Sequence, residues 1–161
     1  MEKAVNVVVA TLVNAPSLAG AGMDEESLRK IRSASPRIKM VDATIPINKE
    51  LRGDFSSKAE LDAILSRAEV VFAFRLPPDI VKRAPNLKWV QMRSAGVERY
   101  LTPEMVSSPV ILTNASGLLA IPISEWVVGV MIMFAKRMPE YFELKRAHKW
   151  QRLDANLLYG K

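Results

Sequence analysis

The sequence contains no cysteine and only one histidine in 161 residues. The lack of cysteine excludes a disulfide framework, thiolate catalysis and cysteine-ligated metal sites, and we expect no metal site. It also fits a reducing compartment, so we expect a cytoplasmic protein. The one histidine, His148, lies among basic residues near a predicted helix end. A surface position that is favourable to the helix dipole is preferred there over a role as base or ligand.

Long apolar runs and glycine-rich phosphate motifs are also absent. No uncharged apolar run reaches the roughly 18 residues of a membrane span, so no membrane partner is expected. The first 13 residues have one Lys and a short apolar run without a small-residue cleavage site. They predict a strand, not a signal peptide. Nothing matches a P-loop, GxGxxG, HExxH or GxSxG motif.

The net charge of +6 comes mostly from the end of the chain. From Lys136 onward there are seven Lys or Arg residues and three acids, which leaves the remaining residues nearly balanced. No aromatic interleaving or nucleic-acid motif accompanies these charges. They predict a solvated helix face, and no nucleic-acid partner is expected.

Five apolar, strand-like runs alternate with helical or turn segments. The runs cover residues 4–13, 38–41, 70–74, 89–92 and 110–113. Helices are predicted at 25–33 with Asp24 as N-cap, at 58–67 with Ser56 or Ser57 as N-cap, and as a short turn at 79–84. Apolar residues at helical spacing mark one buried face of the second helix, namely Leu61, Ile64, Leu65 and Ala68. Residues 44–54, with Pro46 and Gly53, are predicted to be loop. This alternation predicts a parallel, doubly wound α/β sheet.

The chain changes character after residue 113. A long helix is predicted from Ile123 to about Trp150, with Pro122 near its first turn. Pro139 should divide it into two helices that meet near residues 137–140. Glu125 is the one acid in this apolar context and is interpreted as a helix-start cap, with a partnered role as the alternative. The surplus of apolar residues predicts a partner surface, from another domain or a second copy.

The stretch 89–98, WVQMRSAGVE, has the form of a strand, a small-residue turn and a helix start. Such a turn exposes N–H groups that, together with the dipole of the helix that follows, favour an anion, but a glycine required only for steric reasons is the alternative. The predicted helix-like segment covers residues 97–101. Arg75 ends a buried strand at the same sheet edge, where it would face an anion or pair with a loop carboxylate.

Three segments, in order and at suitable spacing, carry a family resemblance: FAFRLPP at 72–78, WVQMRSAGVE at 89–98 and LTNASGLLAIPISEWVVGVMIMFAKR at 112–137. Together with W-Q-R and L-Y-G-K at the end, they resemble the N-terminal half of the D-isomer-specific 2-hydroxyacid dehydrogenases. Ser124, where the family usually has Ala, and Glu98, where Asp is commoner, are mild departures.

The resemblance implies a flavodoxin-like, substrate-binding α/β domain over residues 1–120, with a parallel sheet of about five strands. Residues 121–161 would form crossover and hinge helices that lead to a nucleotide-binding domain. The backbone of Ser94, Ala95, Gly96 and Val97 would hold the carboxylate of a small 2-hydroxy or 2-oxo acid, with Arg75 as a second contact. Ile123 would border the cleft for NAD or NADP. The 123–145 region would form a homodimer surface.

The resemblance also implies what this sequence lacks. The sequence ends where the dinucleotide fingerprint would begin, and it lacks the arginine, acid and histidine that act on the substrate. No catalytic residue is therefore assigned, and we expect this chain alone to be inactive. The competing hypothesis is a non-enzymatic flavodoxin-like module for binding or dimerisation. A receiver-type regulatory domain is disfavoured, because the first and third strands end without carboxylates.

Overall fold

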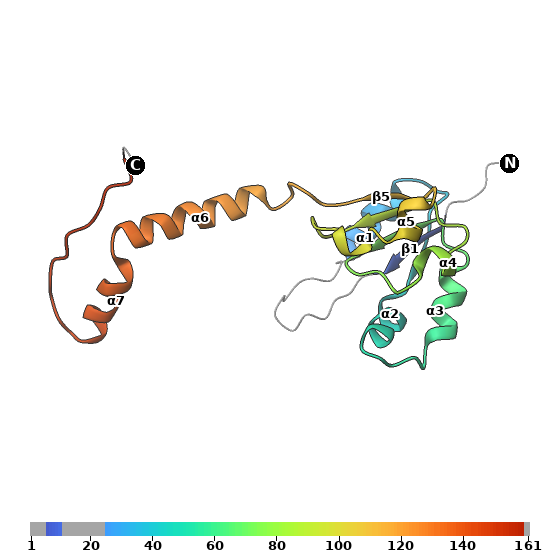
Figure 1. Ribbon diagram of the computed structural model, residues 1–161, viewed down its shortest axis with the longest axis horizontal. Coiled ribbons are helices and arrows are strands. Elements are labelled where there is room, and N and C mark those ends of the chain that lie inside the picture. Colours follow the sequence, from blue (N-terminus) through green and yellow to red (C-terminus); the bar gives the residue numbers. More distant parts are fainter. Residues whose placement is uncertain (1–5, 11–24, 160–161) are drawn as a thin grey trace. The chain divides into compact units, whose positions relative to one another are not determined.

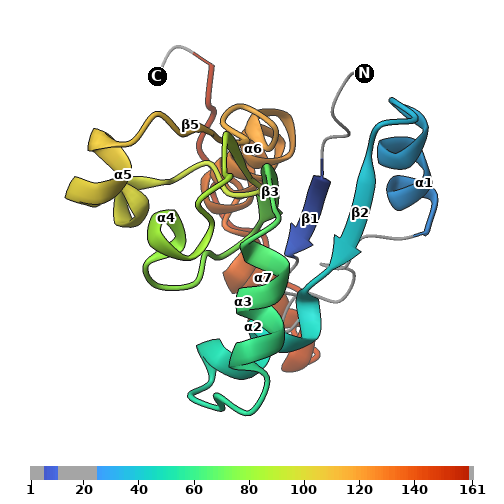
Figure 2. The same ribbon diagram turned by 90° about the vertical axis from the view of Figure 1, so that its right-hand side faces the viewer.

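The computed structural model describes residues 6–10 and 25–159. The chain divides into two compact units, Met1–Ser116 and Gly117–Lys161. The first unit holds a five-stranded sheet in the order β2-β1-β3-β4-β5. All neighbouring strands in it are parallel, and Figure 2 shows β1 and β2 side by side. The predicted parallel α/β class is confirmed.

The strands fall where the apolar runs predicted them. They are β1 (Asn6–Ala10), β2 (Lys39–Asp42), β3 (Val70–Ala73), β4 (Trp89–Met92) and β5 (Ile111–Thr113). The outer parts of the first predicted run, and the proposed N-cap Asp24, lie outside the described residues. Strands of a parallel sheet commonly have continuous apolar sequences, because helices cover the sheet. This is why the strands could be predicted from the sequence.

Helices connect the strands in the first unit. They are α1 (Glu25–Ser33), α2 (Thr44–Leu51), α3 (Lys58–Leu65), α4 (Ile80–Arg83), the 3-10 helix η1 (Glu98–Tyr100) and α5 (Pro103–Ser107). α3 ends two residues before the predicted Arg67. Ser57 occupies the N-cap position, but its side chain makes no capping hydrogen bond and instead accepts one from Lys49 Nζ at 3.2 Å.

The prediction of a loop over residues 44–54 is wrong, because most of this segment is helix α2. Pro46 is the third helical residue, where a missing N–H breaks no intrahelical bond. Gly53 follows the helix with φ of 84°. Its N–H donates to Glu50 O, and the next N–H donates to Lys49 O, which is the Schellman pattern of a helix end. Both supposed loop signals therefore mark helix ends.

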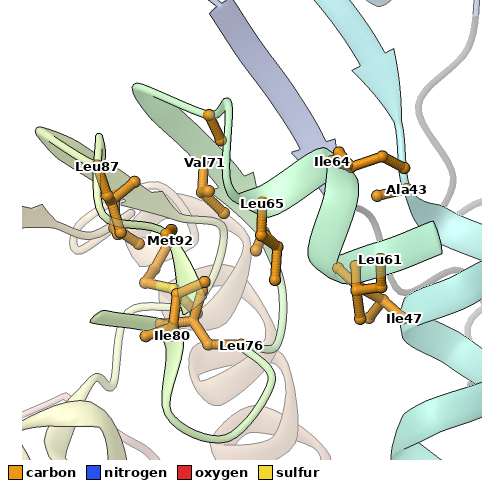
Figure 3. Close-up of a cluster of buried hydrophobic side chains, with 14 of the residues drawn as sticks. Ala43, Ile47, Leu61, Ile64, Leu65, Val71, Leu76, Ile80, Leu87 and Met92 are labelled. Atoms are coloured by element: carbon orange, nitrogen blue, oxygen red, sulfur yellow. The ribbon is translucent and has the colours of Figure 1, made fainter. Parts of the chain in front are cut away.

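The core lies where α2, α3 and α4 pack on the sheet. The face of α3 predicted from sequence, Leu61, Ile64, Leu65 and Ala68, is buried. In Figure 3, Leu61 lies against Ile47 of α2, and Met92 of β4 lies with Leu76 and Ile80. The register fixes this arrangement by pairing Ala73 of β3 with Met92 of β4.

A buried ion network ties the same three helices together. Arg83 of α4 donates to both carboxylate oxygens of Glu50, at 2.5 and 2.8 Å, and to Asp62 Oδ1 at 2.6 Å. The bond to Glu50, opposed by burial and helped by Asp62, raises the pKa of Arg83. Burial alone would raise the pKa of Asp62, but Arg83 and Lys58 outweigh it and lower that pKa.

The second unit contains α6 (Ala120–Ala135) and α7 (Met138–Arg146), seen in Figure 1. The predicted break is confirmed: Arg137 separates the helices with φ of 55°, and Pro139 lies in the first turn of α7. α6 starts three residues before the predicted Ile123, because Pro122 is tolerated in its first turn. α7 ends at Arg146, short of the predicted Trp150.

The interpretation of Glu125 as a helix-start cap is wrong. The earlier start of α6 places this residue beyond the first turn, and its side chain is exposed. No residue of α6 is buried. Within residues 6–10 and 25–159, no helix is both long and apolar enough to cross a bilayer.

Candidate functional site

The parallel register brings two predicted site segments to one edge of the sheet. Ala73 and Met92 are partners at the ends of β3 and β4, and the Arg93 N–H donates to Ala73 O at 2.8 Å. Arg75 and Ser94 each lie two residues beyond these partners. Carboxyl ends of parallel strands share an edge, and this is where ligands bind in open α/β sheets.

A pocket of about 190 Å³ lies at this edge. It is lined by Phe74, Arg75, Ser94, Gly96, Arg99 and Tyr100. The pocket joins three predicted residues, namely Arg75, Ser94 and Gly96. Ala95 and Val97 belong to the same turn but do not line the pocket. Arg99 and Tyr100 were not predicted as site residues.

The hydrogen bonds of the turn leave its N–H groups available. The Ser94 carbonyl accepts from the Ala115 N–H at 3.0 Å, and the Ala95 carbonyl accepts from Asn114 Nδ2 at 2.7 Å. The Gly96 carbonyl accepts from Ser94 Oγ at 2.9 Å. None of the N–H groups of residues 94–97 donates to another described residue. The turn therefore satisfies its acceptors within the protein, whereas its donors have no acceptor among the described residues.

The predicted helix over residues 97–101 is only the three-residue η1. A single 3-10 turn has too few aligned peptide dipoles to act as a helix N-terminus, so the expected contribution of a helix dipole is wrong. The groups of this turn that could attract an anion are its N–H groups and the nearby cations.

Gly96 is not explained by a left-handed backbone. Among the described glycines, only Gly53 and Gly117 have positive φ. A Cβ built on Gly96 would lie 2.9 Å from Glu98 Oε2, the end of a flexible side chain, and would meet no backbone atom within 4 Å. Neither the conformation nor backbone crowding around this turn requires a glycine.

Two arginines supply positive charge to the pocket. Arg75 and Arg99 are exposed, and neither forms an ion pair with any carboxylate of the described residues. The Arg99 guanidinium carbon lies 5.8 Å from the ring centroid of its neighbour Tyr100. The alternative of a loop carboxylate paired with Arg75 finds no such partner in residues 25–159.

Known proteins resemble this chain in sequence and in fold. No family model matches the chain. Over 78 residues, it is 24% identical to a glyoxylate reductase of Thermofilum pendens, an alignment that covers 48% of this chain and 23% of that protein. A D-isomer-specific 2-hydroxyacid dehydrogenase family protein from Aeromonas salmonicida is 20% identical, with a TM-score of 0.68, over 99% of this chain and 44% of that one.

A third protein is similar to most of this chain. The NADPH-dependent glyoxylate/hydroxypyruvate reductase of Sinorhizobium meliloti, solved with NADP and sulfate, is 25% identical with a TM-score of 0.62. That match covers 94% of this chain and 41% of the reductase. The chain resembles the D-isomer-specific 2-hydroxyacid dehydrogenases. It spans less than half the length of the dehydrogenases that it matches.

The remaining residues singled out from sequence lie in the second unit. Ile123, for which the dehydrogenase resemblance implies a place beside the cofactor, is an exposed residue of α6. His148 is exposed just after α7, with φ of 51°. Among the described residues, no group of three His, Asp or Glu side chains is arranged to hold a metal ion.

Proposed function

We propose that this chain is the substrate-binding part of an NAD(P)-dependent oxidoreductase that interconverts small 2-hydroxy and 2-oxo acids. The observation that carries the proposal is the pocket at the β3–β4 edge, which is lined by Arg75 and by Ser94 and Gly96 of a turn whose N–H groups donate to no described residue. Charge-assisted hydrogen bonds of this kind bind a carboxylate strongly. They also orient the adjacent carbonyl carbon, as hydride transfer requires.

Each residue of the turn has a defined part in this proposal. The N–H groups of Ser94, Ala95, Gly96 and Val97 hold the substrate carboxylate, and Arg75 makes a second, forked contact with it. Gly96 has no side chain of its own beside these N–H groups, and the flexible Glu98 side chain, whose Oε2 lies 2.9 Å from the Cβ position, turns away when the substrate carboxylate binds.

The cofactor requires residues that this sequence does not contain. There is no GxGxxG motif to hold a pyrophosphate. The Sinorhizobium reductase was solved with NADP, and we propose NAD or NADP for the intact protein, with Ile123 at the border of its site. When bound, the nicotinamide supplies or accepts the hydride. The proton for the substrate oxygen also comes from a group outside this sequence, so we assign no catalytic residue.

The two units take different roles in this proposal. Residues 1–120 form the substrate-binding domain, and residues 121–161 form crossover and hinge helices that lead to a nucleotide-binding domain. The apolar, exposed side chains of α6 support a homodimer through the 123–145 region. We place the protein in the cytoplasm, in keeping with its lack of cysteine.

The test is a titration of the labelled 161-residue chain with pyruvate or glyoxylate, followed by NMR. Amide signals of residues 94–97 should shift, and Arg75→Met should weaken binding about tenfold, the loss of one charge-assisted contact. Arg29→Met is the control, because Arg29 is an exposed arginine outside the pocket. Binding that leaves these amides unmoved would contradict the proposal.

A second measurement addresses turnover. With NADH and glyoxylate, hydroxypyruvate or pyruvate, we expect this chain alone to oxidise no NADH. Clear oxidation would show that a nucleotide site exists within these residues.

The second candidate function is a non-enzymatic binding or dimerisation module, which is favoured by the apolar helix α6, none of whose residues is buried. That function predicts a stable dimer whose amides at 94–97 do not respond to any 2-oxo acid. The same titration therefore separates the two candidates.

A further inference from the structure

The pocket holds more positive charge than one carboxylate needs. Arg75 follows β3, whereas Arg99 comes from η1, so two separate segments each bring an arginine to the lining of the same pocket. A carboxylate has about four lone-pair sites, which the free N–H groups of the turn and the fork of Arg75 suffice to fill. Arg99 is then surplus to the binding of a single carboxylate.

Among the described residues, no carboxylate pairs with Arg99. Its recorded contact is with the ring of the adjacent Tyr100. Two like charges on one small pocket repel each other, and an added anion relieves this repulsion. The volume of about 190 Å³ equals the liquid share of roughly six water molecules, enough for a small organic acid.

We propose that Arg99 binds a second carboxylate, so that the site prefers dicarboxylic 2-hydroxy or 2-oxo acids over monocarboxylic ones of equal length. The first carboxylate lies at the 94–97 turn with Arg75, and the second lies at Arg99. The inference rests on the proposed function, because it assigns a substrate class to the same pocket.

The test compares 2-oxoglutarate with 2-oxopentanoate. Both have five carbons and a 2-oxo acid end, but only 2-oxoglutarate has a second carboxylate. Dissociation constants are measured by NMR titration of the 161-residue chain. We expect 2-oxoglutarate to bind about tenfold more tightly, the value of one charge-assisted contact.

Arg99→Gln should remove this preference and leave the affinity for 2-oxopentanoate within about twofold. Arg99→Lys should restore part of it, because an ammonium keeps the charge but loses the fork. Arg29→Gln makes the same charge change outside the pocket and should retain the full preference.

The outcomes separate this inference from the function on which it rests. Equal affinity of the unaltered chain for both acids, with shifts at residues 94–97, overturns the inference and leaves the proposed function standing. Equal weakening of both acids by Arg99→Gln also overturns it, since Arg99 would then serve the shared carboxylate. Failure of both acids to bind overturns the proposed function as well.

Discussion

Replacing Arg83 with methionine tests what holds the frame of the pocket together. Arg83 is the shared donor to Glu50 of α2 and Asp62 of α3, and it lies on α4, which follows the segment that carries Arg75. Methionine keeps much of the aliphatic volume but removes the hydrogen bonds to Glu50 and Asp62 and the longer one to the Pro78 carbonyl. The substitution therefore measures the ion network more than the packing of the stem.

The expected loss of unfolding free energy follows from the exposure of each side chain in the network. The Glu50 side chain is 4% exposed and that of Arg83 is 11% exposed, so Arg83→Met leaves a buried charge unpaired. Breaking such a pair costs about 3–5 kcal/mol in fully buried sites. Asp62 is 41% exposed and recovers solvation, so its share is small. We expect Arg83→Met to lower the free energy of unfolding by about 3 kcal/mol.

Glu50→Gln should cost less, about 2 kcal/mol, because Arg83 retains its bond to Asp62 and an amide still accepts one hydrogen bond. The double variant should cost at least about 1 kcal/mol less than the sum of the two single variants, since both remove the same pair. Additive costs would refute the reasoning, as would a cost for Arg83→Met below about 1 kcal/mol, the value of a screened surface pair.

The assay is urea unfolding followed by tryptophan fluorescence. Trp126 and Trp150 belong to the second unit, so both are replaced by phenylalanine and the emission then reports Trp89 of β4. This matters because two units need not unfold together. Arg29→Met in the same background is the control for loss of an exposed arginine.

Three further predictions follow from single residues. Gly96→Ala should change the unfolding free energy by no more than about 1 kcal/mol, because the φ of Gly96 is not left-handed. The added methyl group should weaken 2-oxopentanoate binding about tenfold. An unchanged affinity in the NMR titration would contradict the role given to this glycine. Because the pKa of Asp62 is lowered in the folded state, its ionised carboxylate adds to the free energy of unfolding above pH of about 4. This stabilisation is lost as the pH falls through the folded-state pKa. Urea unfolding from pH 6 to 3 should show that loss in the unaltered chain but not in Asp62→Asn, and identical slopes would contradict it. Trp126→Glu, on the exposed surface of α6, should convert a sedimenting dimer to monomer, and an unchanged sedimentation coefficient would exclude this helix from the interface.

The sequence predicted most of what depends on a simple period or a continuous apolar run. The buried face of α3 and the runs that became β3 and β4 are examples, because burial on one or both faces leaves a direct trace in residue type. α2 was missed because Pro46 and Gly53 were interpreted as loop signals. Each has a second meaning, at a first helical turn and at a Schellman end, that only the neighbouring backbone distinguishes.

The site was predicted in part for the same physical reason. Ser94 and Gly96 stand in a strand-to-turn pattern, and Arg75 ends an apolar run, so each had a local signal. Arg99 had none, since an exposed arginine beside a tyrosine is ordinary surface composition. Only the parallel register and the turn of η1 bring Arg99 to the pocket that Arg75 also lines. The notion of a helix dipole failed because a short local pattern cannot fix how far a helix extends.

Three arginines of the first unit show how the fold separates stability from binding. Arg83 is half-buried and paired with two carboxylates, so its charge contributes to holding α2, α3 and α4 together. Arg75 and Arg99 are exposed and without an ion-pair partner among the described carboxylates, so the fold gains little from their charge. Charge that does not stabilise a protein but is gathered on one pocket is expected where a ligand supplies the opposite charge. Under the proposed function, the sheet edge thus carries a binding surface whose residues can change without loss of the frame, and the substrate class can vary there while the core remains the same.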